Sequence, residues 1–409
     1  MLIRHSILFI SLASLALAGC APMNPYIKAE GEYYAGDPFT AESTLAPLYE
    51  KEAEKDGKMT NLYLWDMGVY RFAQGNYEGA AELFLKSVKD KEAIHDAGET
   101  TKAILTSSGD QKYVGDPVEV SVAYLYLGLS YYMLGDYKNA WRAFKRSTEE
   151  DLSKEEVRHG DMALTNFLLG ECYERLNEPD DAIAAYRRAV ESSKGLVPGY
   201  IALYAALKKR GREANIPQIL EEIEKRVDGE YFEEIKENPD QGIVLVVLSG
   251  RPSPVTADDI VGAFRSRTET NCPASCWQMS CDTAATYFNM FLADHMHNHF
   301  KDQGGLSDEM RQQATRAVVA EGMKKIPVLG LFAPETKADV RYWPTMHGWS
   351  YIGYYPAGEG THSLRLQAYD YNNNMLSACS KSWDAIPVDE KKRTLVVMTS
   401  CGILCKQRE

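Results

Sequence analysis

The sequence SVAYLYLGLSYYMLGDYKNAWRAFKRS, residues 121–147, decides the fold of the first half of the chain. Within it, large residues such as Tyr124 and Phe144 alternate with small ones such as Gly128 and Ala140 at helical spacing. The small residues allow two antiparallel helices to approach closely, and the aromatic rings fill the space between them. One such helix pair cannot bury its apolar face alone, so the stretch predicts further pairs on either side of it.

Two neighbouring segments repeat this pattern. Upstream it falls on Gly68, Gly75, Tyr77, Ala80 and Phe84, and downstream on Gly170, Tyr173, Ala182, Tyr186 and Ala189, with Pro179 at the turn. The spacing resembles that of the tetratricopeptide repeat. We therefore expect a helical repeat domain over residues 29–230, with a degenerate helix pair near Gly36 at its start and a capping pair over 200–227. A stack of helix pairs is a binding scaffold far more often than an enzyme, so we expect no catalytic activity.

The first twenty residues have the pattern that is typical of an export signal. A charged start at Arg4 and His5 precedes an apolar run that is too short for a permanent membrane span. The run ends in Leu17-Ala18-Gly19-Cys20, which resembles a bacterial lipobox; an ordinary secretory cleavage site is the alternative. The lipobox predicts a signal peptide at 1–19, lipid attachment at Cys20 and a tether at 20–28. It also predicts a lipoprotein on the bacterial outer membrane that faces the periplasm.

Charge and cysteine positions narrow the classes of partner and cofactor. The formal net charge of -13 argues against nucleic acid, which rewards clustered Lys and Arg. Cys172 falls on a repeat helix, where a free thiol suits the core. Six other cysteines fall in the last third of the chain, where an oxidising compartment favours disulfides with 15 alternative pairings: Cys272, Cys276, Cys281, Cys379, Cys401 and Cys405. We expect neither a metal nor a cofactor.

From Gly242 onward the pattern changes from helices to strands. The run 243–248 is continuously apolar and β-branched, as is typical of a buried strand. Further strands are predicted over 328–332, 349–354, 363–369 and 394–399, and helices over 282–300 and 307–325. The sequence therefore predicts an α+β protein. An all-α solenoid of tetratricopeptide-like repeats is followed by a smaller α+β domain, residues 240–405, with a mainly antiparallel sheet.

Three local motifs accompany the repeats, in the order YVGDPVE at 113–119, GIVLVVL at 242–248, and ADVRYWP at 338–344 followed by GTHSL at 360–364. With the repeats, they resemble an uncharacterised tetratricopeptide-repeat lipoprotein family of Gram-negative envelopes. The genes of that family tend to lie beside those of lipoprotein activators of penicillin-binding proteins. The resemblance therefore implies a role in cell-envelope or peptidoglycan assembly. The cysteine-rich segment 272–281 departs from the family pattern.

A scaffold of this kind would bind a protein partner in the envelope. Solenoids present the first helix of each pair on their concave face, which makes five residues candidates for partner binding: Asn61, Leu64, Tyr124, Asn166 and Glu171. Asp339, Arg341 and Trp343 alternate, so they should share one face of a strand, where a charged pair beside an aromatic ring could dock a partner. A structural cross-strand pair explains the same three residues equally well.

An alternative class is a papain-like cysteine hydrolase of the envelope. The sequence around Cys276 faintly resembles the nucleophile segment of such enzymes, and His362 would supply the base. Lys381 stands where the family has an asparagine, and the distance from Cys276 to His362 in the sequence is short. Structural disulfides therefore explain the cysteines better.

The three histidines His295, His297 and His299 lie within a predicted helix. Spacing of four puts His295 and His299 on one face, but no further metal ligands are evident at that face. We expect a solvated helix end there.

Overall fold

A computed structural model describes residues 24–96, 112–151, 160–257, 265–267, 276–282, 288–302, 341–370, 372–390 and 392–399. The predicted signal peptide and the lipidation site Cys20 lie outside the described residues, as do Cys272, Cys401, Cys405 and Asp339. The fold is α+β as predicted, with a helical repeat region followed by a smaller region of mainly antiparallel sheets.

The helical region consists of antiparallel pairs stacked side by side. The pairs are α2 (Pro25–Tyr34) with α3 (Pro38–Ala53), α4 (Thr60–Ala73) with α5 (Tyr77–Asp96), α7 (Pro117–Met133) with α8 (Tyr137–Glu150), α9 (Ala163–Arg175) with α10 (Pro179–Ser192), and α11 (Val197–Lys209) with α12 (Ile216–Glu224). A last helix, α13 (Gly229–Glu237), follows. Among the described residues no helix combines the length and the apolar character that crossing a membrane would require.

The turn inside each pair repeats one backbone conformation. Gly36, Gly75, Gly135, Asn177 and Gly211 occupy equivalent positions, and all have φ from +60° to +90°. This left-handed conformation is accessible to Gly and Asn at little cost, which explains why these residue types recur there. The helix pair that we expected near Gly36 is therefore present, and its first helix begins at Pro25, inside the segment predicted as a tether.

Close helix contact in three pairs depends on a glycine on the first helix that faces an aromatic ring of the second. A Cβ at Gly68, Gly128 or Gly170 would lie 2.8, 2.4 or 2.3 Å from the ring of Phe84, Phe144 or Tyr186. Each ring follows its glycine by the same number of residues, so the pattern that we read from the sequence is the packing contact of each pair.

The strands that the structure describes form two four-stranded sheets and one hairpin. The first sheet has the order β10-β1-β7-β6 and contains β1 (Gly242–Ser249), β6 (Phe291–His295), β7 (Trp349–Pro356) and β10 (Arg393–Thr399). The second has the order β5-β4-β8-β9 and contains β4 (Cys276–Cys281), β5 (Phe288–Asn289), β8 (Gly360–Tyr369) and β9 (Lys381–Val388). β2 (Val255–Ala257) and β3 (Arg265–Arg267) form the hairpin. Among the described strands, every pair is antiparallel except β1 with β10.

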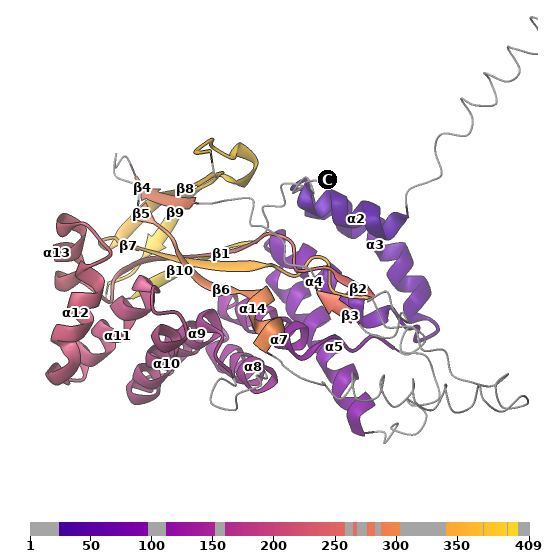
Figure 1. Cartoon of the computed structure of the whole chain (residues 1–409), viewed down its shortest axis with the longest axis horizontal. Coiled ribbons are helices and arrows are strands. Elements are labelled where there is room, and N and C mark those ends of the chain that lie inside the picture. Colours follow the sequence, from indigo (N-terminus) through magenta and orange to yellow (C-terminus); the bar gives the residue numbers. More distant parts are fainter. Residues whose placement is uncertain are drawn as a thin grey trace, which may run out of the picture.

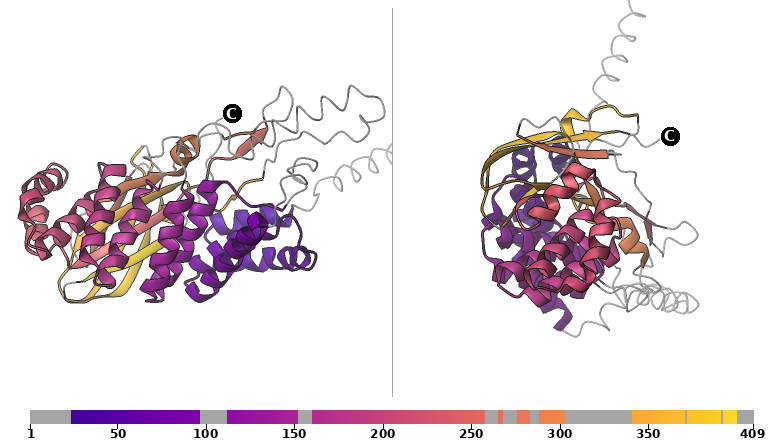
Figure 2. Two further views of the ribbon diagram at one scale, coloured as in Figure 1. Left: turned by 90° about the horizontal axis from the view of Figure 1, so that it is seen from below. Right: turned by 90° about the vertical axis from the view of Figure 1, so that its left-hand side faces the viewer.

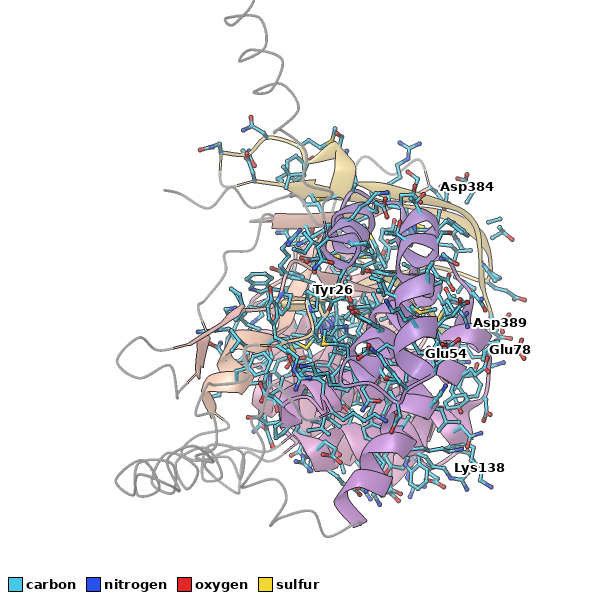
Figure 3. All side chains as sticks on the ribbon, turned by 90° about the vertical axis from the view of Figure 1, so that its right-hand side faces the viewer. Tyr26, Glu54, Glu78, Lys138, Asp384 and Asp389 are labelled. Carbon is cyan, nitrogen blue, oxygen red and sulfur yellow. The ribbon has the colours of Figure 1, made fainter. Side chains whose placement is uncertain are left out.

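Strand β1 is buried along its whole length because it lies in the middle layer of the molecule. Val244, Val246 and Leu248 pack into the same core as the helices, whereas Ile243 and Leu245 on the other face pack toward β4, β8 and β9. Figures 1 and 2 show the strands lying along one side of the row of helices. Charged side chains such as Glu54, Glu78 and Lys138 point outward from this body in Figure 3. The molecule thus has three layers: the helical repeats, the first sheet, which contains β1 (the β1 sheet), and the second sheet, which contains β4 (the β4 sheet).

Several strands follow the prediction, and one predicted helix is wrong. The strands expected over 243–248, 349–354, 363–369 and 394–399 are β1, β7, β8 and β10. Residues 282–300 do not form one helix: they contain β5, β6 and the start of a short helix, α14 (Met296–Asp302). The reason is that an edge strand of the first sheet is needed beside β7, and apolar residues of this segment supply it. The elements predicted over 307–325 and 328–332 lie outside the described residues.

Replacing Gly128 with Ala should lower the free energy of unfolding by about 1–3 kcal/mol, because the new Cβ would overlap the ring of Phe144. Gly31, in α2, has no atom within 4 Å of a Cβ built on it. Gly31→Ala is therefore the matched control and should stabilise by up to about 1 kcal/mol through helix propensity. Urea unfolding of both variants measures the difference. Equal effects of the same sign would contradict the packing role of Gly128.

Candidate interaction site at the concave face

The concave face of the repeats is covered by the C-terminal part of the same chain. The first helices α4, α9 and α11 contact strands of the β1 sheet, and α7 contacts α14. The candidate partner-binding residues of this face are therefore buried, with 5% or less of each exposed: Asn61, Leu64, Tyr124, Asn166 and Glu171. The expectation that they form a free binding surface is wrong, because the apolar face that they belong to is already filled from within the molecule.

The segment 341–347, which is neither helix nor strand, enters this face. The side chain of Trp343 is fully buried, and its ring centroid lies 5.1 Å from that of Trp65 and 5.8 Å from that of Tyr126. Its backbone N–H donates to Glu119 Oε1 at 3.0 Å. Trp343 is thus an internal core residue rather than a docking side chain on a strand. Arg341 donates to the carbonyl of Lys58 at 3.0 Å.

Two polar contacts hold the same segment to the first two helix pairs. The hydroxyl of Tyr34 donates to the carbonyl of Pro344 at 2.7 Å, and the hydroxyl of Thr345 donates to the carboxylate of Asp66. Asp66 lies on α4 and is completely buried. Burial raises the pKa of Asp66 to about 7, although the hydrogen bond from Thr345 acts in the opposite direction. Near neutral pH this carboxyl therefore binds a proton in the folded protein.

The pH dependence of stability should change when Asp66 is replaced with Asn. Its folded pKa of about 7 is above the ordinary 3.8, so its contribution to stability is complete below pH 3.8 and is lost as pH rises toward 7. Asp66→Asn removes this titration. Relative to the parent protein, the variant should gain about 2–3 kcal/mol between pH 5 and pH 8. Urea unfolding at both values measures this, and His347, whose pKa burial lowers to about 4, cancels because both proteins contain it. A difference that does not vary with pH would contradict the assignment.

A buried ion pair joins β10 to the fourth helix pair, α9 with α10. Arg393, at the start of β10, donates from Nε to Glu171 at 2.7 Å and from a terminal nitrogen to the hydroxyl of Tyr186 at 3.0 Å. The same nitrogen contacts the carboxylate of Glu174. The side chains of Arg393 and Glu171 are only 3% and 4% exposed. Glu171 is therefore the internal partner of an arginine that the sequence interpretation did not single out.

Replacing Arg393 with Met should cost about 3–5 kcal/mol of unfolding free energy, because it leaves the carboxylate of Glu171 buried without its cation. The exposed ion pair between Arg146 and Glu149 provides the control, since both side chains are nearly half exposed. Arg146→Met should change stability by less than about 1 kcal/mol. Chemical denaturation of both variants distinguishes them. An Arg393→Met variant as stable as Arg146→Met would refute the role of this pair.

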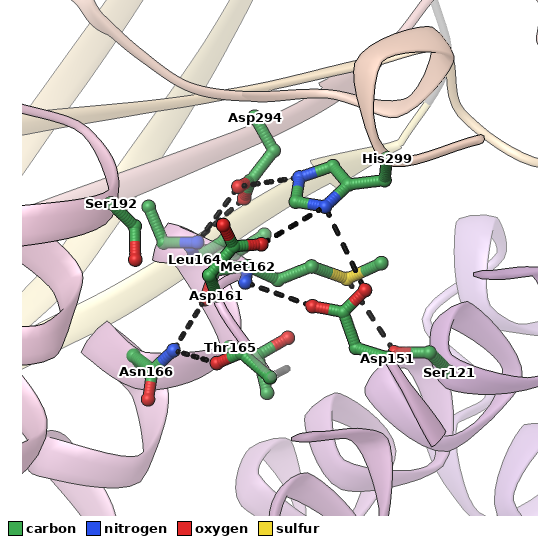
Figure 4. A network of polar contacts seen from close by, with 12 residues as sticks. Ser121, Asp151, Asp161, Met162, Leu164, Thr165, Asn166, Ser192, Asp294 and His299 are labelled. Atoms are coloured by element: carbon green, nitrogen blue, oxygen red, sulfur yellow. Dashed lines mark hydrogen bonds and ion pairs between the residues drawn. The ribbon is translucent and has the colours of Figure 1, made fainter. Parts of the chain in front are cut away.

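A second polar cluster surrounds His299 of α14 (Figure 4). The carboxylate of Asp294 accepts from the backbone N–H groups of Ala163 and Leu164 at 2.7 and 2.9 Å, and so caps the start of α9 from β6. Asp294 Oδ1 also lies 3.3 Å from His299 Nε2. The other ring nitrogen, Nδ1, lies 3.5 Å from a carboxylate oxygen of Asp161 and 3.7 Å from one of Asp151.

Charge and burial oppose each other at this histidine. Burial alone would lower the pKa of His299, but the carboxylates of Asp151 and Asp294 outweigh burial and raise it well above its ordinary value. His297 and His299 are both buried, at 5% and 9% exposure. The expectation of a solvated helix end is therefore wrong, because the strand β6 directs the segment into the molecule before α14 begins.

Strand register separates the two residues of the hydrolase hypothesis. Cys276 on β4 lies opposite Tyr369 on β8, seven positions along β8 from His362. At roughly 3.3 Å per residue this places the two backbone positions about 23 Å apart, far beyond hydrogen-bond reach. The pairing of Cys276 with His362 as nucleophile and base is therefore wrong.

The residues that the structure does bring to His362 are Cys281 and Asp282. His362 Nδ1 lies 2.8 Å from Asp282 Oδ2, and its Nε2 lies 2.8 Å from the carbonyl of Gly358. One donor atom each from Cys281, Asp282 and His362 lie within 4.8 Å of one another. Burial, with the charge of Asp282, raises the pKa of the Cys281 thiol to about 12, so this thiol is protonated and is not an activated nucleophile.

The cysteines follow the prediction in part. Cys172 is a buried free thiol, as expected, and Cys379 is disulfide-bonded, with a partner that is not among the described side chains. Cys281 is a buried free thiol rather than a disulfide cysteine, because it faces the core between the two sheets. The side chain of Cys276 lies outside the described part of the chain.

Comparison with known proteins supports the repeats. A family model described as tetratricopeptide repeat matches residues 119–194, which include the stretch that predicted the fold. No curated protein matches the chain. A crystal structure of MamA aligns with a TM-score of 0.36 and 17% sequence identity, covering 51% of this chain and 94% of that chain. MamA from Desulfovibrio magneticus RS-1 aligns with a TM-score of 0.36 and 15% identity, covering 52% and 93%.

Proposed function

We propose that this protein is a lipid-anchored scaffold on the outer membrane of a Gram-negative bacterium. It faces the periplasm, binds a protein partner and takes part in cell-envelope or peptidoglycan assembly. The observation that carries the proposal is the tandem array of tetratricopeptide-like helix pairs, since such arrays are typical of interaction proteins. The lipobox-like sequence before Cys20 supports the anchor, and the resemblance to envelope lipoproteins supports the compartment.

The burial of the concave face bears on where we propose that a partner binds. Because the chain's own sheet covers that face, the binding surface would lie on the outer side of the helices. The first helix pair carries two large exposed hydrophobic side chains, Ile27 on α2 and Phe39 on α3, at 55% and 64% exposure. Both are close in sequence to Cys20, so the anchor would hold this pair near the membrane. We therefore place the partner contact at α2 and α3.

Site-specific photocrosslinking in intact envelopes tests the proposal. A photoreactive residue at Phe39 should give a protein adduct in the outer-membrane fraction, identified by mass spectrometry. The same residue at Leu134, which is 49% exposed but lies on a turn of the third pair, is the matched control and should give little adduct.

Combining each position with Cys20→Ala separates anchoring from binding. Acyl chains contribute about 0.8 kcal/mol per buried CH2, so loss of all chains should move the protein to a soluble or unprocessed pool and reduce the Phe39 adduct. A Cys20→Ala variant of mature size, retained in outer membranes at the parent level, would refute the anchor. Equal adducts at Phe39 and Leu134 would refute the proposed contact surface.

A further inference from the structure

At the seam, where the helical repeats contact the β1 sheet, three segments of the chain each bring one side-chain atom that can bind a metal ion. Asp151 follows α8, Asp161 precedes α9, and His299 belongs to α14. One donor atom from each lies within 4.8 Å of the others. The backbone N–H of Gly160 donates to the carbonyl of Asp151 at 2.8 Å and so holds the two aspartates together. A Cβ at Gly160 would lie 2.7 Å from the carbonyl oxygen of Thr148, so the position requires glycine.

The distances at His299 Nδ1 are not those of simple hydrogen bonds. Its separations of 3.5 and 3.7 Å from the carboxylates of Asp161 and Asp151 exceed the usual 2.7–3.2 Å or so of a hydrogen bond. Donors bound at about 2.0–2.2 Å in a tetrahedron around one metal ion lie roughly 3.3–3.6 Å from one another. The separations of the two carboxylates from this imidazole nitrogen therefore match the distances between ligand atoms in a tetrahedral metal site.

The other ring nitrogen provides independent support. His299 Nε2 faces Asp294, whose carboxylate is fixed by the hydroxyl of Ser350 and by the two N–H groups at the start of α9. A metal-bound histidine commonly donates its second ring N–H to a carboxylate, which fixes the ring and its tautomer. This arrangement leaves Nδ1 as the nitrogen directed toward Asp151 and Asp161.

We propose that Asp151, Asp161 and His299 bind a divalent transition-metal ion of the zinc class, with Asp294 as the residue that orients His299. One nitrogen and two carboxylate oxygens suit Zn²⁺ better than Ca²⁺ or Mg²⁺, which prefer oxygen ligands alone. Asp161 is the most exposed of the three ligands, at 19% of its side chain, so a water molecule from that side would supply the fourth ligand. Bound there, the ion joins the repeats to the sheet and so stabilises the arrangement of the two parts.

The test is zinc binding by the full chain, purified in detergent without a polyhistidine tag and stripped with a chelator. Zn²⁺ should bind with one equivalent at this site and raise the thermal unfolding temperature, whereas Ca²⁺ should do neither. Asp161→Asn replaces the most exposed ligand with a residue of the same shape, so it should fold. It should weaken zinc binding at least about tenfold. His299→Gln is the second variant and should have the same effect.

The matched control is His362→Asn, which alters the other group of metal-type side chains, Cys281, Asp282 and His362. Zinc affinity at the proposed site should be unchanged in this variant. Cobalt bound to the proposed site should show no thiolate-to-metal charge-transfer band, because its ligands contain no sulfur. The proposal is overturned if the chain binds no zinc, if Asp161→Asn binds as the parent does, or if binding is lost in His362→Asn instead.

Discussion

The structure depends on the need to cover the apolar concave face of the helix pairs. In this chain the cover is the sheet built on β1, whose Val244, Val246 and Leu248 face the helices while Ile243 and Leu245 face the second sheet. A strand buried on both faces can carry no polar side chain on either, which is why residues 243–248 are apolar without alternation. The repeats and the sheet thus share one core, and neither part is complete without the other.

Buried polar and charged side chains fix how the two parts meet. Apolar surfaces can pack against each other in several alignments at similar free energy. A carboxyl group in the core destabilises the fold strongly unless hydrogen-bond donors reach it. Glu171 with Arg393, Asp294 with the start of α9, and Asp66 with Thr345 are three such contacts, at separate points along the seam. Sliding the sheet along the helices would break all three together. The apolar contacts supply most of the stabilising area, and these pairs select a single arrangement.

The repeats were predictable from sequence because their determinants are local. Gly128 and Phe144 meet within one hairpin, and the same spacing recurs in its neighbours, so periodicity alone reveals the contact. Strand β1 was predictable from its uninterrupted apolar run. Strands β4 and β9 were missed, since β4 lies in a cysteine-rich segment and β9 contains Pro387, which is tolerated at the edge of a sheet. The occupant of the concave face was not predictable, because Trp343 and Trp65 are brought together only by the whole fold. The buried roles of Asp294 and Arg393 were hard to predict from the sequence, because each residue is only a charged side chain next to an apolar strand segment.

The cap of α9 has a consequence for the order in which the chain folds. Met162, at the position before this helix, makes no side-chain cap hydrogen bond, and the carboxylate that accepts from Ala163 and Leu164 comes from Asp294. Contacts between residues so distant in sequence are costly in loop-closure entropy and form late. While the chain is synthesised from its N-terminus, α9 exists before its cap does. The middle of the solenoid therefore stays uncapped, and its apolar face stays open, until the sheet segment has emerged. During that interval a chaperone would find the concave face available, and completion of the sheet would then exclude it.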